Sequence, residues 1–165
     1  MTRILIFLVW VFLVNPVPRL SGQARRLRSA ARPEATVGGT RIELTAYAWL
    51  NLQPGLSPDL PDSSARPSSP PMAPLHVVTR IRSMTGRPLP RGLRSDSAFV
   101  LWDRRSCALA LVPQGASDTS IAARVWGGPR WLLDADSLDV IVRVRAPGQR
   151  DVYLRAPRVV LVRAF

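Results

Sequence analysis

A single cysteine and a single histidine are the first residues in this chain that could support nucleophilic chemistry. A catalytic Cys-His pair needs an exposed thiol in an electropositive setting, where it can ionise beside the imidazole. Cys107 alternates with Leu109 and Leu111, which predicts a small apolar residue of a strand. His76 stands at the start of another apolar segment. We therefore expect no catalytic pair, and a lone cysteine cannot form a disulfide within the chain.

Three carboxylates lie close together in the segment DADSLD, at Asp134, Asp136 and Asp139. Hard cations such as calcium bind clustered carboxylates, and paired carboxylates also hydrolyse glycosides. The segment lacks the glycine and the distal glutamate of a helix-loop-helix calcium loop, and Asp and Ser are ordinary turn residues. These aspartates are the candidates for a metal-assisted or aspartate-based hydrolase, which stays open as the alternative function. Because the chain has no usual zinc ligand set and no glycine-rich phosphate loop, we expect no cofactor.

Tryptophan and arginine side chains supply the candidate binding residues. Trp126 and Trp131 flank the sequence GGPR, so both rings could stand beside Arg130 for sugar stacking or as a protein hot spot. Packing in the core or at a sheet edge is the alternative for these tryptophans. Arginines that alternate with apolar residues should face outward and could form a basic stripe; they are Arg80, Arg82, Arg143, Arg145 and Arg155.

Every basic residue of the chain is an arginine, 23 of them against 11 acidic residues, which gives a net charge of +12. The complete absence of lysine, together with abundant Ala, Pro and Gly, is typical of a GC-rich genome, so part of this charge reflects codon usage. The charge favours anionic partners such as lipid headgroups, acidic polysaccharide or nucleic acid, but it does not choose among them.

The first 24 residues have the three parts of a secretory signal. Arg3 precedes an uncharged apolar run at 4–14, and prolines and the small-residue stretch SGQA follow. A run of 11 residues is much shorter than the ~20 that span a bilayer, which favours a signal peptide at 1–24, cleaved after Ala24. Residues 25–39, which begin RRLRSAAR, are expected to form a basic, disordered leader. Export makes nucleic acid a disfavoured partner.

The remaining chain, residues 40–165, reads as a series of short strands. Alternation of apolar and polar residues, bounded by turn residues, predicts strands at 40–50, 75–84, 96–102, 107–112, 121–126, 137–145, 151–156 and 158–165. The sequence DRRS would form the turn of a hairpin between the predicted strands 96–102 and 107–112. A loop rich in proline and serine at 51–74 interrupts the series.

Seven to eight such strands predict an all-β fold, a two-layer antiparallel β-sandwich, with a small barrel as the alternative. The segments LTAYAWLNLQPG, PLPRGLRSDSAFVL, GGPRW and VIVRVRAPGQRDVYLRAP together resemble a group of short exported bacterial proteins of unknown function. That resemblance implies an immunoglobulin-like sandwich and export, and it brings no catalytic or binding residues with it.

These observations together predict an exported, non-enzymatic module for interaction or structural support, in the periplasm or outside the cell. Its partner would be an envelope protein or an anionic polymer, bound through arginine-rich strand faces. The candidate binding residues are Trp126, Arg130, Trp131, Arg143 and Arg145.

Overall fold

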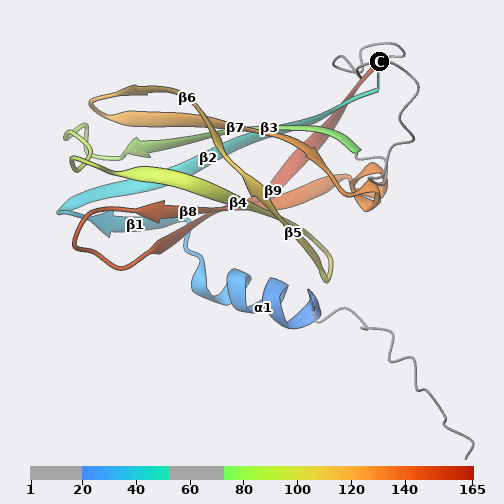
Figure 1. The fold of residues 1–165 in the computed structure, drawn as a ribbon, viewed down its shortest axis with the longest axis horizontal. Helices are drawn as coiled ribbons and strands as arrows, with labels where there is room; N and C mark the ends of the chain where they lie inside the picture. The colour runs from blue at the N-terminus through green and yellow to red at the C-terminus, as the bar shows by residue number, and fades with distance from the viewer. Residues whose placement is uncertain (1–19, 53–72) are drawn as a thin grey trace, which may run out of the picture.

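The computed structural model describes residues 20–52 and 73–165, which form nine strands, one α-helix and one 3-10 helix (Figure 1). The elements in chain order are α1 (Leu20–Ala30), β1 (Glu34–Val37), β2 (Thr40–Asn51), β3 (Ala73–Ser83), β4 (Arg94–Trp102), β5 (Arg105–Ala110), β6 (Val112–Ser117), β7 (Ser120–Gly128), η1 (Arg130–Asp134), β8 (Ser137–Arg145) and β9 (Val152–Ala164).

The strands belong to one curled, mixed sheet with the order β5-β4-β8-β9-β2-β3-β7-β6, to which β1 adds by pairing with β2. All strand pairs are antiparallel except β2 with β9, which run parallel from Ala48↔Leu161 to Asn51↔Ala164. The two outermost strands of this order, β5 and β6, follow each other in the chain with only Leu111 between them. The sheet therefore bends round on itself, and we call its halves sheet A (β5-β4-β8-β9) and sheet B (β2-β3-β7-β6).

The core lies between the two halves and is built from the inward-facing members of each alternating strand. In β8, Leu138, Val140, Val142 and Val144 are all buried, as their period of two predicts. They pack against the inward-facing residues of sheet B in one hydrophobic cluster. Residues of sheet B that are fully buried in this cluster include Leu50, Leu75, Val77 and Val125. Burial of these apolar faces is the main stabilising contribution to the fold.

The all-β prediction is confirmed, and each predicted strand segment overlaps a strand of the structure, although the segment 107–112 runs from β5 through Leu111 to the first residue of β6. The predicted hairpin at DRRS is also present, with Trp102 paired to Arg105 and a left-handed φ of 51° at Asp103. Two expected strands at the C-terminus are one in the structure. Strand β9 runs through Pro157 because Arg158 adopts a φ of 51°, which bends the strand without ending it. The structure adds β6, which the sequence pattern did not separate from β5.

The prediction of a disordered leader at 25–39 is wrong, because these residues are ordered and belong to the domain. Residues up to Ala30 complete helix α1, and β1 forms a hairpin with β2 through Gly38 and Gly39. Both glycines have positive φ, 54° and 79°, as a two-residue turn of this kind requires. The folded domain thus begins before residue 40.

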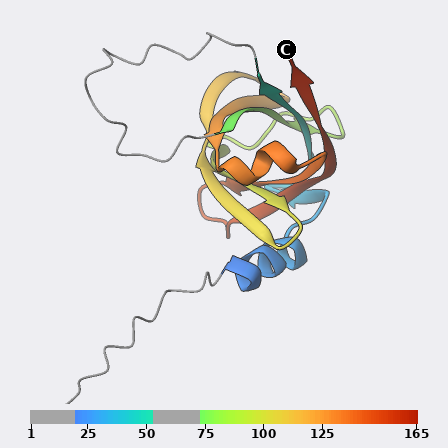
Figure 2. The ribbon, with the colours of Figure 1, turned by 90° about the vertical axis from the view of Figure 1, so that its right-hand side faces the viewer.

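Figures 1 and 2 show α1 below the sheet, beside the turn that joins β4 to β5. Residues 1–19 of the expected signal and most of the proline-rich loop, 53–72, lie outside the described residues. Within the described ranges, no helix has the length and apolar character needed to cross a membrane.

Candidate functional site: an aromatic face on sheet B

The two tryptophans that flank GGPR contact different partners. Trp131 lies in η1 and stacks on Trp102, with ring centroids 6.1 Å apart and planes 14° apart, and both rings pack against the core. Trp126 lies near the end of β7 on the outer surface of sheet B, with 47% of its area exposed. Arg130 is exposed at the start of η1. Trp126 and Trp131 therefore contact different neighbours, and among the described residues no ring contact joins either of them to Arg130.

Trp126 is part of a row of side chains that crosses four strands, three of sheet B and the adjoining β9, on their outer surface. The strand register places Val162 of β9 beside Trp49 of β2, Trp49 beside His76 of β3, and His76 beside Trp126. Side chains at matched positions of neighbouring strands share a face and contact one another. The His76 ring stacks on Trp49 at 5.0 Å and 12°, and meets Trp126 at 4.0 Å and 56°. We call these four residues the aromatic row.

A second row lies beside the first, two residues along each strand. It runs from Tyr47 through Val78 and Arg124 to Val112 of β6. Tyr47 is 71% exposed, and the Arg124 guanidinium lies 4.5 Å from the centre of the Trp126 ring, a cation–π contact. We call the two rows together the aromatic face. Exposed apolar side chains that form one continuous patch, rather than scattered single residues, are typical of a binding surface.

The position of His76 in the aromatic row lowers its pKa. Its side chain is buried between the two indole rings, and burial lowers its pKa, with a further lowering from the charge of Arg124. Cys107 lies on β5 in the other half of the sheet, and burial raises the pKa of its thiol. The two residues are thus on different sheets and each is shifted toward its neutral form, which is the opposite of what a nucleophilic pair requires.

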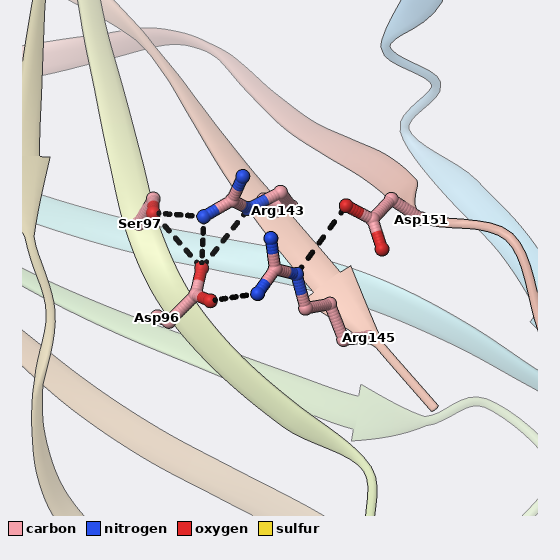
Figure 3. A network of polar contacts seen from close by, with 5 residues as sticks. All are labelled: Asp96, Ser97, Arg143, Arg145 and Asp151. Carbon is pink, nitrogen blue, oxygen red and sulfur yellow. Dashed lines mark hydrogen bonds and ion pairs between the residues drawn. The ribbon is translucent and has the colours of Figure 1, made fainter. Parts of the chain in front are cut away.

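Two of the predicted binding arginines, Arg143 and Arg145, form ion pairs within sheet A (Figure 3). Arg143 donates from Nε and Nη2 to Asp96 Oδ1, at 3.0 and 2.9 Å, and from Nη2 to the Ser97 hydroxyl at 2.8 Å. Arg145 pairs with Asp96 Oδ2 at 2.9 Å and with Asp151 at 3.3 Å. Their charges are therefore largely matched by neighbouring carboxylates, so they do not form a free basic stripe.

The electrostatics of this network fit that interpretation. Burial alone would raise the pKa of Asp96, but hydrogen bonds from Ser97 and Arg143 and the charges of Arg143 and Arg145 outweigh it and lower the pKa. The hydrogen bond to Asp96 in turn raises the pKa of Arg143 above its usual range. The network stays ionised at neutral pH and ties β4 to β8, which is a structural role.

Of the other three strand arginines named in the prediction, two form ion pairs and one does not. Arg82 is paired with Glu43, and Arg155 with Asp139. Arg80 is exposed on the outer surface of β3, one position beyond Val78 on the same face, and has no ion pair among the described residues. Together with Arg124 it gives the border of the aromatic face a positive charge.

The DADSLD carboxylates point to different partners. Asp139 is 7% exposed and accepts hydrogen bonds from Arg28, Arg155 and the backbone N–H of Arg158. Asp136 has a side chain 92% exposed, and it pairs with Arg163 at 3.4 Å. Asp134 is exposed at the end of η1. Within residues 20–52 and 73–165, no three His, Cys, Asp or Glu side chains are grouped as a metal site would need.

Comparisons of this chain with protein-family models, curated proteins and solved structures found no match. The candidate site therefore depends on the geometry of the side chains alone.

Two signals in the sequence point to the aromatic face: alternation places Tyr47 and Trp49 on the same face of one strand, and Trp126 is a candidate binding residue. His76 and Trp126 stand alone in their strands, and each is more than 25 residues from the next member of the row along the chain. Only the pairing of β2, β3 and β7 brings them together.

Proposed function

We propose that this protein is an exported, non-enzymatic, immunoglobulin-like β-sandwich module that binds an acidic polysaccharide through its aromatic face. The observation that carries the proposal is the row of Trp49, His76, Trp126 and Val162, in which Trp126 and Val162 are exposed, bordered by the exposed Tyr47 and by positive charge.

The strand order supports the immunoglobulin-like assignment. If β2 to β9 are lettered A, B, C, C′, D, E, F and G in chain order, sheet B reads A-B-E-D and sheet A reads C′-C-F-G. This order matches that of the two sheets of an immunoglobulin domain with an added C′ strand. The parallel contact of β2 with β9 then lies between the first and last strands. The cysteine pair of antibody domains is absent, since the chain has one cysteine.

The chemistry of the aromatic face favours a sugar polymer with carboxylate groups. Pyranose rings have apolar C–H surfaces that pack on tryptophan and tyrosine, and the exposed edges of Trp126 and Tyr47 are available for this. Arg80 and Arg124 can pair with carboxylates along such a polymer. The acidic side chain near these arginines is Glu43, and its charge is already paired with Arg82. An extended polymer fits a surface that crosses four strands without a deep pocket.

Export by the N-terminal segment agrees with this partner, because acidic polysaccharides belong to cell envelopes and their surroundings. The apolar run at 4–14 and the positive Arg3 before it support the assignment.

Titration calorimetry with a polyuronate, such as polygalacturonate, tests the binding function, with neutral dextran of similar length as the control polymer. We expect binding to the polyuronate that weakens as salt is added, since charge pairs at a surface are screened. Tyr47→Ser should weaken it by about three- to tenfold without altering the fold, as expected for loss of one exposed stacking ring. Arg80→Gln should also weaken binding. Its matched control is Arg150→Gln, a change at an exposed arginine in the turn between β8 and β9.

Equal binding of the wild type, Tyr47→Ser and Arg80→Gln would contradict the proposed site. Binding to dextran as tight as to polyuronate would contradict the role of the arginines. Capture of an envelope protein through the same residues, with no polysaccharide bound, would replace the proposed partner by a protein.

A further inference from the structure

Helix α1 packs on the outer surface of sheet A and is part of the domain. Ala24 and Ala31 are 2% and 6% exposed, and they share a hydrophobic cluster with Leu101 of β4 and Ile141 of β8, both fully buried. The side chains of Leu27, Phe99 and Tyr153 complete this cluster. Without α1, this part of the sheet would expose a continuous apolar patch to water.

Polar contacts fix the position of the helix on the sheet. Arg28 donates from Nε to Asp139 at 3.0 Å and from Nη1 to the carbonyl of Asp103 at 2.6 Å. Just after the helix, Arg32 pairs with β9: its N–H donates to the Tyr153 carbonyl, and its own carbonyl accepts from the N–H of Arg155. The helix is thus held both along its length and at its C-terminal end.

The outward side of the same helix is basic. Arg25 and Arg26 are exposed, and the exposed Arg104, in the turn between β4 and β5, lines the same concave region as Arg25. A concave region of about 500 Å³ is lined by Gly22, Ala24, Arg25, Arg28, Asp103 and Arg104. Of these arginines, only Arg28 has an ion pair among the described residues. Asp103 is the one acidic side chain in the lining, so the surface is positive.

We propose that this surface, formed by the N-terminal half of α1 and the β4–β5 turn, rests on an anionic lipid bilayer. Two observations support a bilayer as the partner. The arginines form a positive surface, and the chain enters α1 at Leu20, a few residues after the uncharged apolar sequence ILIFLVWVFLV. An apolar segment joined to a basic patch supplies the two signals that stable membrane attachment requires.

This interaction is independent of the aromatic face, which lies on the outer surface of sheet B.

The packing of α1 on the sheet also determines whether the N-terminal segment can be removed without loss of buried contacts. Cleavage after Ala24 would remove the first five residues of α1, including the buried Ala24, and would leave a six-residue remnant of the helix. We therefore infer that the segment before α1 stays attached to the domain in the native protein.

Flotation of the full-length protein with lipid vesicles tests the membrane surface. Vesicles of phosphatidylcholine alone are compared with vesicles that contain 30% phosphatidylglycerol, a composition chosen for the test. Each arginine close to an anionic surface raises partitioning by about fivefold. Replacing both Arg25 and Arg104 by Gln should therefore reduce the preference for the anionic vesicles by roughly 25-fold. The matched control is Arg87→Gln with Arg150→Gln, two exposed arginines outside the proposed surface.

Equal partitioning of the wild type to both kinds of vesicle would overturn the proposal, as would an unchanged preference in the Arg25/Arg104 variant. Release from the vesicles by single-stranded oligonucleotide at equal phosphate concentration would assign the surface to nucleic acid instead. The intact mass of the protein isolated from its native host gives an independent test. A mass that begins at Arg25 contradicts the retained helix, whereas a mass that includes residues 20–24 and the preceding segment agrees with it.

Discussion

Replacing Asp139 by Asn should destabilise the domain far more than the same change at its neighbour Asp136. Asp139 lies almost buried in β8 and joins three parts of the structure: Arg28 of α1, and Arg155 and the bend at Arg158 in β9. Asparagine has nearly the same shape but no charge. Its side chain can keep one acceptor for the Arg158 N–H, but it leaves two guanidinium groups without their counter-ion.

The size of the effect follows from the contacts. A hydrogen bond to a charged group contributes about 1.5–3 kcal/mol, and removing one partner of a fully buried ion pair costs about 3–5 kcal/mol. The side chains of Arg28 and Arg155 are 34% and 30% exposed, so water replaces part of the lost interaction. We therefore expect Asp139→Asn to lower the free energy of unfolding by about 2–3 kcal/mol.

Urea denaturation followed by tryptophan fluorescence measures this difference. Asp139→Asn should shift the midpoint with little change in the slope, because the surface exposed on unfolding is nearly the same. Asp136→Asn is the matched control from the same segment; its side chain is 92% exposed, and its loss should change stability by less than about 0.5 kcal/mol. Equal effects of the two substitutions would refute the structural role assigned to Asp139. A calcium-dependent stabilisation that either substitution abolishes would restore the metal-site hypothesis.

Three further predictions concern other buried or half-buried groups. His76 has a lowered pKa, so the folded state binds its proton less readily than the unfolded chain; stability should fall as pH drops from above the unfolded value of about 6.5 toward the folded pKa. Because the chain has one histidine, His76→Gln should remove this pH dependence in urea titrations between pH 7.5 and 5.5, and a retained slope would contradict it. Ile141→Ala should lower the free energy of unfolding by about 2–4 kcal/mol, because α1 covers Ile141. Val160→Ala, at an exposed site, should lower it by less than about 0.5 kcal/mol. Similar losses for the two variants in urea denaturation would mean that α1 does not cover Ile141. Cys107 should react with a disulfide reagent more slowly at pH 7.5 than a free thiol does, because burial raises its pKa; reaction at the rate of cysteine in a short peptide would contradict its burial.

The strands were predictable because alternation is a local property. In β8 the four inward-facing core residues Leu138, Val140, Val142 and Val144 repeat every second position, and the same signal identified most other strands. Helix α1 was missed because its apolar side is narrow: Ala24 and Leu27 face the sheet, and most of the remaining positions are arginine, serine, glycine or glutamine. Its stability depends on contact with Leu101 and Ile141, which are distant in sequence.

The candidate site was not predictable to the same extent, because it depends on which strands are neighbours. Arginines 143 and 145 do face outward as alternation predicts, but the sequence gives no indication that Asp96 of another strand neutralises them. Similarly, Trp126 was identified as a binding residue, yet its partners His76 and Trp49 come from two other strands rather than from the nearby Trp131. Pairing across a sheet decides both outcomes.

The most direct test of the aromatic face is a nuclear magnetic resonance titration of the indole N–H signals with polygalacturonate. The described residues contain four tryptophans, two in the aromatic row and two stacked on each other against the core. We expect the signals of Trp49 and Trp126 to shift as polymer is added, while those of Trp102 and Trp131 stay in place. Shifts confined to Trp102 and Trp131, or no shift of any indole at saturating polymer, would contradict the account.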